Sequence, residues 1–123
     1  MELLAYKRIL CIDNSKDDCE LFGFVLAQAG YKVKSAQVAE AALQLIKAAQ
    51  FDLCLASVSL FNGFGFSLIE KIRIASPRVP LIVCSADVRL VAWKQAIKAG
   101  AWAFFEKPID FDRLLATVTR LLQ

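Results

Sequence analysis

Five polar side chains stand at the carboxyl ends of short apolar runs: Asp13, Asn14, Ser57, Ser85 and Lys107. Together they offer a carboxylate, an amide, two hydroxyls and an ammonium, a set polar enough for a present or former active site. One apolar run, residues 53–56, ends at Ser57, so the chemistry open to such a site depends largely on a serine hydroxyl. The alternative is that strand ends are wet and carry polar residues for that reason alone.

Residue types that are missing or scattered narrow the chemistry further. The sequence contains no histidine, which excludes histidine-based acid–base catalysis and the common zinc sites. The four cysteines show no CxxC spacing, and three of them (Cys11, Cys54 and Cys84) fall inside apolar runs where a reduced thiol acts as a small core residue. Disulfide and metal roles are therefore not expected of them.

The runs before the polar residues have the length and composition of buried parallel strands. They cover residues 8–12, 53–56, 81–84 and 101–105, and residues 31–35 alternate apolar and polar side chains as a half-exposed edge strand would. In open α/β sheets the working site lies in the crevice beyond the carboxyl ends of the strands. The five polar residues are therefore expected to converge there.

Helices are expected between these strands. Ser15 suits the N-cap of the first, and Asp18 three residues later completes a capping-box pattern, while Gly30 ends that helix. Further helices are expected over residues 38–49, 66–75 and 89–99, and Asp110 can cap a last one. The side chains expected to pack the first and last helices are Cys19, Phe22, Leu26, Ala29, Leu114, Leu115, Val118, Leu121 and Leu122. Because strands and helices alternate five times over short connections, the 123 residues predict a single doubly wound α/β domain.

Composition sets limits on location and partners. Hydrophobic residues make up 58% of the chain, yet no run approaches the ~20 apolar residues of a membrane span. The first residues carry a charge at position 2 and lack the apolar core of a signal peptide. A soluble cytoplasmic protein with no membrane partner is expected. Lys and Arg are scattered despite the net charge of +3, so no nucleic-acid partner is expected either.

Four motifs together resemble the receiver domain of bacterial two-component response regulators. They are residues 8–14, 51–66, 84–86 and 99–108, and the similarity covers residues 7–122. The resemblance implies a flavodoxin-like five-stranded parallel sheet in the order 2-1-3-4-5, and a cis peptide bond before Pro108. It also implies phosphoryl transfer onto an aspartate beside Mg²⁺, with the first acid at Asp13, the hydroxyl at Ser85, the lysine at Lys107 and the switch aromatic at Phe104.

Two positions depart from the pattern of that family. Asn14 stands where a second acid belongs, and Ser57 stands where the phospho-accepting aspartate belongs. Mg²⁺ prefers carboxylate ligands, so its binding is expected to be weak or absent, with Asp13, Asn14 and the Ser59 carbonyl as weak candidate ligands. A serine needs an adjacent base, unlike an ionised aspartate. Lys107 is expected to pair with Asp13, the only remaining acid, with Ser57 and Ser85 as bridging donors.

These departures predict a degenerate receiver domain, either free-standing or part of a longer regulator. It is expected to be no enzyme, to use no cofactor, and to act as a phosphorylation-independent protein-interaction module in signal transduction. One alternative is a phosphoryl-accepting receiver whose acceptor has been replaced by Ser57, through engineering or with serine as the modified residue. A flavodoxin-like cofactor binder is a third class, but residues 13–17 lack the glycine of a phosphate loop and are net negative.

Two surfaces are candidates for partner contact. One is the loop around Phe61 and Phe64, although one of these aromatics could instead fill the emptied pocket while the other packs locally. The other is the face of the fourth helix, fifth strand and fifth helix, which the resemblance implies for homodimerisation and signalling partners. Trp93, Trp102 and Phe104 are expected on or near this face, and Trp93 suits a core position equally well.

Overall fold

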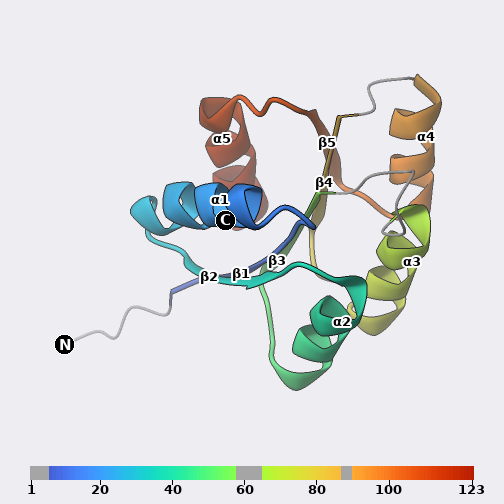
Figure 1. The fold of residues 1–123 in the computed structure, drawn as a ribbon, viewed down its shortest axis with the longest axis horizontal. Helices are drawn as coiled ribbons and strands as arrows, with labels where there is room; N and C mark the ends of the chain where they lie inside the picture. The colour runs from blue at the N-terminus through green and yellow to red at the C-terminus, as the bar shows by residue number, and fades with distance from the viewer. Residues whose placement is uncertain (1–5, 58–64, 87–89) are drawn as a thin grey trace.

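The computed structural model describes residues 6–57, 65–86 and 90–123 (Figure 1). In these ranges five strands alternate with five helices. The strands are β1 (Arg8–Ile12), β2 (Lys32–Ala36), β3 (Leu53–Ser57), β4 (Leu81–Ser85) and β5 (Ala103–Glu106). The helices are α1 (Lys16–Gln28), α2 (Ala39–Ala48), α3 (Gly65–Ala75), α4 (Leu90–Ala99) and α5 (Phe111–Leu121).

The strands form one parallel sheet in the order β2-β1-β3-β4-β5, which confirms the predicted fold class and topology. All five residues of β3 and of β4 are buried, as expected for strands covered on both faces. The predicted edge strand is also confirmed, because β2 lies at one edge of the sheet and most of its residues are exposed.

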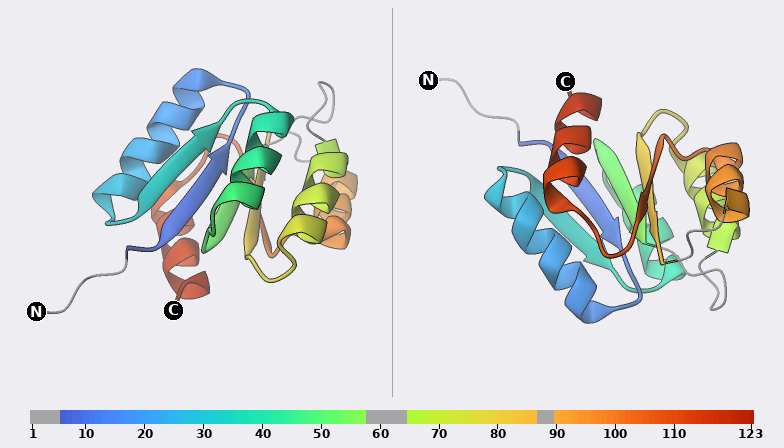
Figure 2. Two further views of the ribbon diagram at one scale, coloured as in Figure 1. Left: turned by 90° about the horizontal axis from the view of Figure 1, so that it is seen from below. Right: turned by 90° about the horizontal axis from the view of Figure 1, so that it is seen from above.

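Each face of the sheet has its own apolar cluster, and Figure 2 shows the two helical layers. On one face α1 and α5 pack against the sheet through Phe22, Leu26, Leu114 and Val118. On the other face α2, α3 and α4 pack through residues that include Ala42, Ile69 and Ala96. Because successive strand residues point to opposite faces, neighbours such as Phe104 and Phe105 belong to different clusters.

Two predicted helix N-caps, Ser15 and Asp110, are confirmed by their hydrogen bonds. The Ser15 hydroxyl accepts a hydrogen bond from the Asp18 amide at 3.2 Å, and the Asp110 carboxylate accepts one from the Arg113 amide at 3.2 Å. Two details were wrong. Ala29 does not pack the first helix, since α1 ends one residue earlier and Ala29 is exposed. The fifth strand begins at Ala103 rather than at residue 101.

Candidate functional site

The register of the sheet brings the predicted polar residues together at the carboxyl end of the strands. Ile12 lies opposite Ala56, so Asp13 and Ser57 each follow one residue later on neighbouring strands. In the same way Ser85, at the end of β4, lies opposite Glu106, and Lys107 comes next. The Lys107 amide donates to the Ser85 carbonyl oxygen at 2.9 Å, which fixes the start of the β5–α5 connection beside β4.

Asp13 is the buried anion of this site, with only 1% of its side chain exposed. Its Oδ1 accepts a hydrogen bond from the Ser15 amide at 2.9 Å, and its Oδ2 accepts one from Lys107 Nζ at 3.0 Å. Both carboxylate oxygens are thus engaged. A buried carboxylate requires such partners, because an unpaired charge away from water is costly.

Lys107 forms the ion pair with Asp13 that the sequence predicts, but the prediction that Asp13 is its only acid was wrong. Nζ of Lys107 also lies 3.0 Å from Oδ2 of Asp18, in the first turn of α1. Sequence reasoning assigned Asp18 to a capping box and missed this contact. The available signal was an acid in the first turn of the helix that directly follows the strand ending at Asp13.

The two carboxylates keep Lys107 charged. Burial acts against the ammonium, but the hydrogen bonds to Asp13 and Asp18 outweigh burial and raise the pKa of Lys107 above its ordinary value near 10.5. The side chain of Lys107 is 24% exposed, that of Asp18 is 42% exposed, and Asp13 is buried. The site therefore consists of one buried anion, one partly buried cation and one partly exposed anion.

The other predicted pocket residues differ in burial. Ser57 and Ser85 are 3% and 2% exposed, so both hydroxyl-bearing residues lie inside the site. Asn14 is exposed. The bridging role expected of the two hydroxyls stays a prediction, and Ser59 lies outside the described residues.

The cysteines lie where core residues are expected. All four are free and buried. Burial raises the pKa of Cys54 and of Cys84 to about 12, so these thiols stay protonated at neutral pH. In the ranges that the structure describes, no group of three or more His, Cys, Asp or Glu residues is arranged to hold a metal ion.

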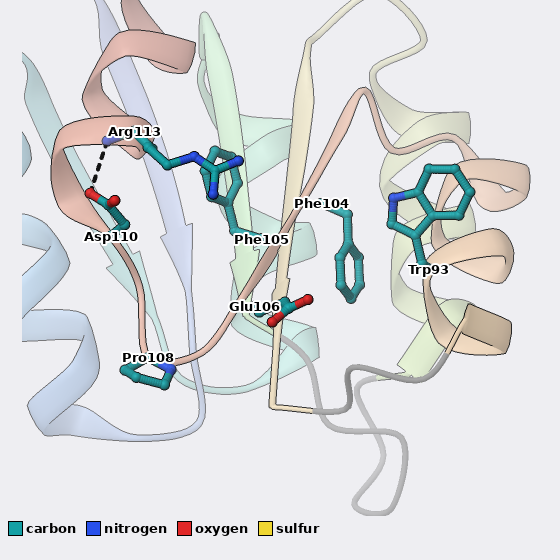
Figure 3. Close-up of a pocket in the computed structure, with 7 residues that line it drawn as sticks. All are labelled: Trp93, Phe104, Phe105, Glu106, Pro108, Asp110 and Arg113. Atoms are coloured by element: carbon teal, nitrogen blue, oxygen red, sulfur yellow. Dashed lines mark hydrogen bonds between the residues drawn. The ribbon is translucent and has the colours of Figure 1, made fainter.

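A second feature lies beside the site, on the face made by α4, β5 and α5. Figure 3 shows a groove with Trp93 of α4 on one side and the start of α5 on the other, with Phe104 between them. Its volume is about 510 Å³, and its lining residues are Trp93, Phe104, Phe105, Glu106, Pro108, Asp110 and Arg113. Trp93 is 46% exposed, so it is no core residue of α4; Ala96 fills that place and is fully buried.

The other two described aromatic residues of the predicted α4–β5–α5 face, Trp102 and Phe104, differ in burial and in position along β5. Trp102 is 53% exposed and precedes β5, at the opposite end of that strand from Lys107. Phe104 is half-buried against the cluster under α2, α3 and α4. Phe61 and Phe64 lie outside the described residues.

The Lys107–Pro108 peptide bond is cis, as predicted. Among the described helices, none has the length and apolar character needed to cross a membrane.

Sequence comparison shows which family has this architecture. The sequence model of the family described as "Response regulator receiver domain" matches residues 9–119. The chain is 33% identical over 121 residues to the response regulator protein PilR of Pseudomonas aeruginosa, covering 96% of this chain and 27% of PilR. It is 31% identical over 114 residues to the transcriptional regulatory protein ZraR of Salmonella typhimurium, covering 93% of this chain and 26% of ZraR. The chain thus spans about a quarter of these curated relatives.

Solved structures agree. The receiver domain protein (CheY-like) of Methanospirillum hungatei superposes with a TM-score of 0.89 at 28% identity, covering 96% of this chain and 94% of that one. A response regulator of Burkholderia pseudomallei, described with a phosphorylated aspartic acid, a calcium ion and citrate, superposes with a TM-score of 0.84 at 28% identity, covering 95% and 66%. The chain belongs to the response regulator receiver domains of two-component signal transduction.

Proposed function

We propose that this receiver domain is degenerate and signals through protein contacts without accepting a phosphoryl group at position 57. The observation that carries the proposal is Ser57 itself. It ends β3, is 3% exposed, and stands where the resemblance implies the acceptor aspartate. A serine hydroxyl must lose a proton in order to attack a phosphoryl donor, whereas an aspartate is already ionised at neutral pH.

The acid next to Ser57 is a poor general base. Asp13 follows the strand residue that pairs with Ala56, and its two carboxylate oxygens already accept hydrogen bonds from Ser15 and Lys107. Both oxygens are therefore already engaged by donors other than Ser57. The geometry therefore supports a pocket in which Ser57 is not activated.

The described residues also do not fit a Mg²⁺ site. Mg²⁺ needs near-octahedral oxygen coordination, usually with one or two carboxylates. Here the buried carboxylate of Asp13 contacts an ammonium at 3.0 Å, and Asn14 is an exposed amide. A metal ion would have to displace Lys107 from Asp13, so we infer that Lys107 balances the charge of Asp13 in place of a metal.

The test is incubation with a small phosphoryl donor and Mg²⁺, followed by intact mass spectrometry. The unaltered chain is expected to gain no mass, and an Asn14→Asp/Ser57→Asp variant is expected to gain one phosphate, because the change restores both acids. Stoichiometric labelling of the unaltered chain would contradict the proposal. If Ser57→Ala then removed that label, the alternative of a serine-accepting receiver would stand in its place.

That alternative has one observation in its favour: Lys107 and Ser85, the residues implied to hold phosphoryl oxygens, remain at adjoining strand ends. The engineered-substitution alternative makes a different forecast, since Ser57→Asp alone would then suffice for labelling. Comparing that single variant with the double variant separates natural decay of the site from a single replaced residue.

Contact is proposed to occur on the α4–β5–α5 face. Trp93 and Ile97 of α4 are 46% and 39% exposed, and the groove beside Trp93 is lined by aromatic side chains together with the charged Glu106, Asp110 and Arg113. Exposed aromatics next to charged rims are typical of protein interfaces. The occupant is a protein, either a signalling partner or a second copy of this chain.

Sedimentation velocity over a range of concentrations tests the homodimer. A dimer that Trp93→Ser weakens would support this face. The matched control is Phe24→Ser, because Phe24 is 64% exposed on α1, a helix that is not part of the α4–β5–α5 face. Dimerisation lost equally in both variants would contradict the assignment, and a monomer at every concentration would leave a different protein as the partner to be sought.

A further inference from the structure

Lys107 is held between two carboxylates that come from different elements. Asp13 follows β1, and Asp18 belongs to the first turn of α1; each carboxylate Oδ2 lies 3.0 Å from Nζ. An ammonium has three N–H donors, so two of the three are committed to these contacts.

The two carboxylates differ in how firmly they are held. Asp13 is 1% exposed and accepts a second hydrogen bond, from the Ser15 amide. Asp18 is 42% exposed, and its carboxylate contacts Lys107 through Oδ2, while its backbone amide donates to the Ser15 hydroxyl. Rotation of the Asp18 side chain would release it to water without breaking the cap. Asp18 is therefore the exchangeable partner of Lys107.

We propose that Asp18 is a positioning residue that holds the Lys107 ammonium against α1 and competes with anions, such as a phosphate group, for that ammonium. The proposal rests on the proposed function in one respect: the pocket must lack the acid at position 57 that would otherwise share Lys107. Asp18 then supplies the second negative charge on Lys107, and the three groups sum to a charge of −1. An incoming anion meets a net negative site.

The ion pair between Asp18 and Lys107 also lies in a groove, so a change in this pair affects the groove. Asp18 and Lys107 both line a groove of about 400 Å³ between α1 and the start of α5. The other lining residues are apolar, namely Leu21, Phe22, Pro108, Ile109 and Phe111, and the rings of Phe22 and Phe111 meet edge to face at 5.6 Å. The ion pair is thus the charged part of an otherwise apolar groove, and it joins α1 to the β5–α5 connection.

The charge on Lys107 is secure while Asp18 is in place. Burial opposes the ammonium, yet hydrogen bonds to Asp13 and Asp18 raise the pKa of Lys107. Removing the carboxylate of Asp18 leaves Asp13 as the partner, frees one N–H donor and brings the remaining pair to neutrality. Both changes favour an anion, because the repulsion by the second carboxylate is gone.

The chain offers a matched control for this step. Asp17 lies next to Asp18 in the same first turn of α1, and it is exposed. Asp17→Asn and Asp18→Asn make the same change of charge and alter the helix dipole at nearly the same place. A difference between the two variants therefore reports the contact with Lys107 rather than the loss of a negative charge near α1.

The experiment keeps Ser57 in every protein compared, so it does not depend on phosphorylation of position 57. Inorganic phosphate is titrated into the parent and both variants, and the Lys107 Nζ and Cε resonances are followed by NMR. Asp18→Asn is expected to bind phosphate about two- to fivefold more tightly than Asp17→Asn, the range of a partly exposed ion pair. It should also lower the pKa of Lys107 in a pH titration, which Asp17→Asn should not.

A conservative variant separates the carboxylate from the fold. Asp18→Glu keeps the charge, and recovery of the parental affinity and Lys107 pKa would support the proposal, provided that urea unfolding shows all variants folded. Equal phosphate affinities and equal Lys107 pKa values for Asp17→Asn and Asp18→Asn would overturn it. That result would leave the proposed function untouched, since it concerns Asp18 and not Ser57.

Discussion

Two cationic side chains lie at opposite ends of the sheet, and they contact oxygen atoms of different chemical types. At the carboxyl end Lys107 contacts the carboxylates of Asp13 and Asp18. At the amino end Arg73 of α3 donates to backbone carbonyl oxygens in two loops: Nη1 to Ser76, Pro77 and Val79 at 3.2, 2.9 and 2.8 Å, and Nη2 to Gly100 at 2.9 Å.

The acceptor groups differ in whether they can move away: the contacts of Arg73 are fixed by the backbone, and one contact of Lys107 is exchangeable. Backbone carbonyls cannot rotate away from Arg73 without moving the loops, and burial lowers the pKa of Arg73 because these oxygens carry no full charge to offset it. Carboxylates raise the pKa of Lys107, and the one from Asp18 can leave by side-chain rotation. The amino end is therefore expected to contribute to stability, and the carboxyl end to both stability and ligand response.

Replacing Arg73 should have the largest effect on stability. Arg73→Met removes the donors to four carbonyl oxygens in the α3–β4 and α4–β5 connections, and we expect a loss of about 2–3 kcal/mol in the free energy of unfolding. Urea denaturation measures it. Arg78→Met is the control, since Arg78 is exposed in the same connection and its loss should stay within about 0.5 kcal/mol. Equal losses would mean that the carbonyl contacts contribute nothing.

Replacing Lys107 should come next. Lys107→Met leaves the buried carboxylate of Asp13 without its cation, which costs about 1–3 kcal/mol after allowance for the partial exposure of Lys107. Asp13→Asn in the same background should recover part of this loss, because the unpaired charge is then removed. No recovery in the double variant, measured by urea denaturation, would show that burial of the charge is not the reason.

A smaller effect is expected at Gly100, which connects the Arg73 contact to backbone geometry. Its φ is +121°, and an added Cβ would lie 2.9 Å from Nε of Arg73. We expect Gly100→Ala to cost about 1–2 kcal/mol, because side chains disfavour this backbone conformation. Gly23→Ala in α1 is the contrast: nothing lies within 4 Å of an added Cβ, so a gain of about 0.5–1 kcal/mol is expected in thermal unfolding.

The smallest effect is a dependence on alkaline pH. Because the folded pKa of Lys107 is above its ordinary value, its pairing with Asp13 and Asp18 stabilises the protein fully below about pH 10.5 and is lost as pH rises through the folded pKa. The stability difference between the parent and Lys107→Met should therefore be constant near neutrality and shrink above that pH. Comparing the two proteins cancels other groups that titrate there. A difference that grows with pH would have the wrong sign for this pair.

The contacts of Lys107 show which interactions could be predicted from the sequence and which could not. The Lys107–Asp13 contact was predictable, because both residues follow strands of one parallel sheet and opposite charges at one edge are drawn together. The contact with Asp18 was not, because a residue in the first turn of a helix can serve as a cap, face water or turn toward the sheet. The direction of its side chain depends on how α1 packs against β1 and β2.

The aromatic residues illustrate the same limit. Trp93 and Ala96 lie three residues apart on α4, so periodicity allowed either to be buried; packing placed Ala96 in the core and left Trp93 at the groove. A small residue there lets α4 approach the sheet closely.

The sequence by itself determined the strands and the chemical types at their carboxyl ends, since these depend on residue identity and on local periodicity, and the resemblance to receiver domains supplied the order of the strands. Only the tertiary structure decided which carboxylates share Lys107, that Arg73 joins two loops, and which apolar side chains stay exposed. Those outcomes depend on distances between segments far apart in the chain, which are set by the packing of helices on the sheet.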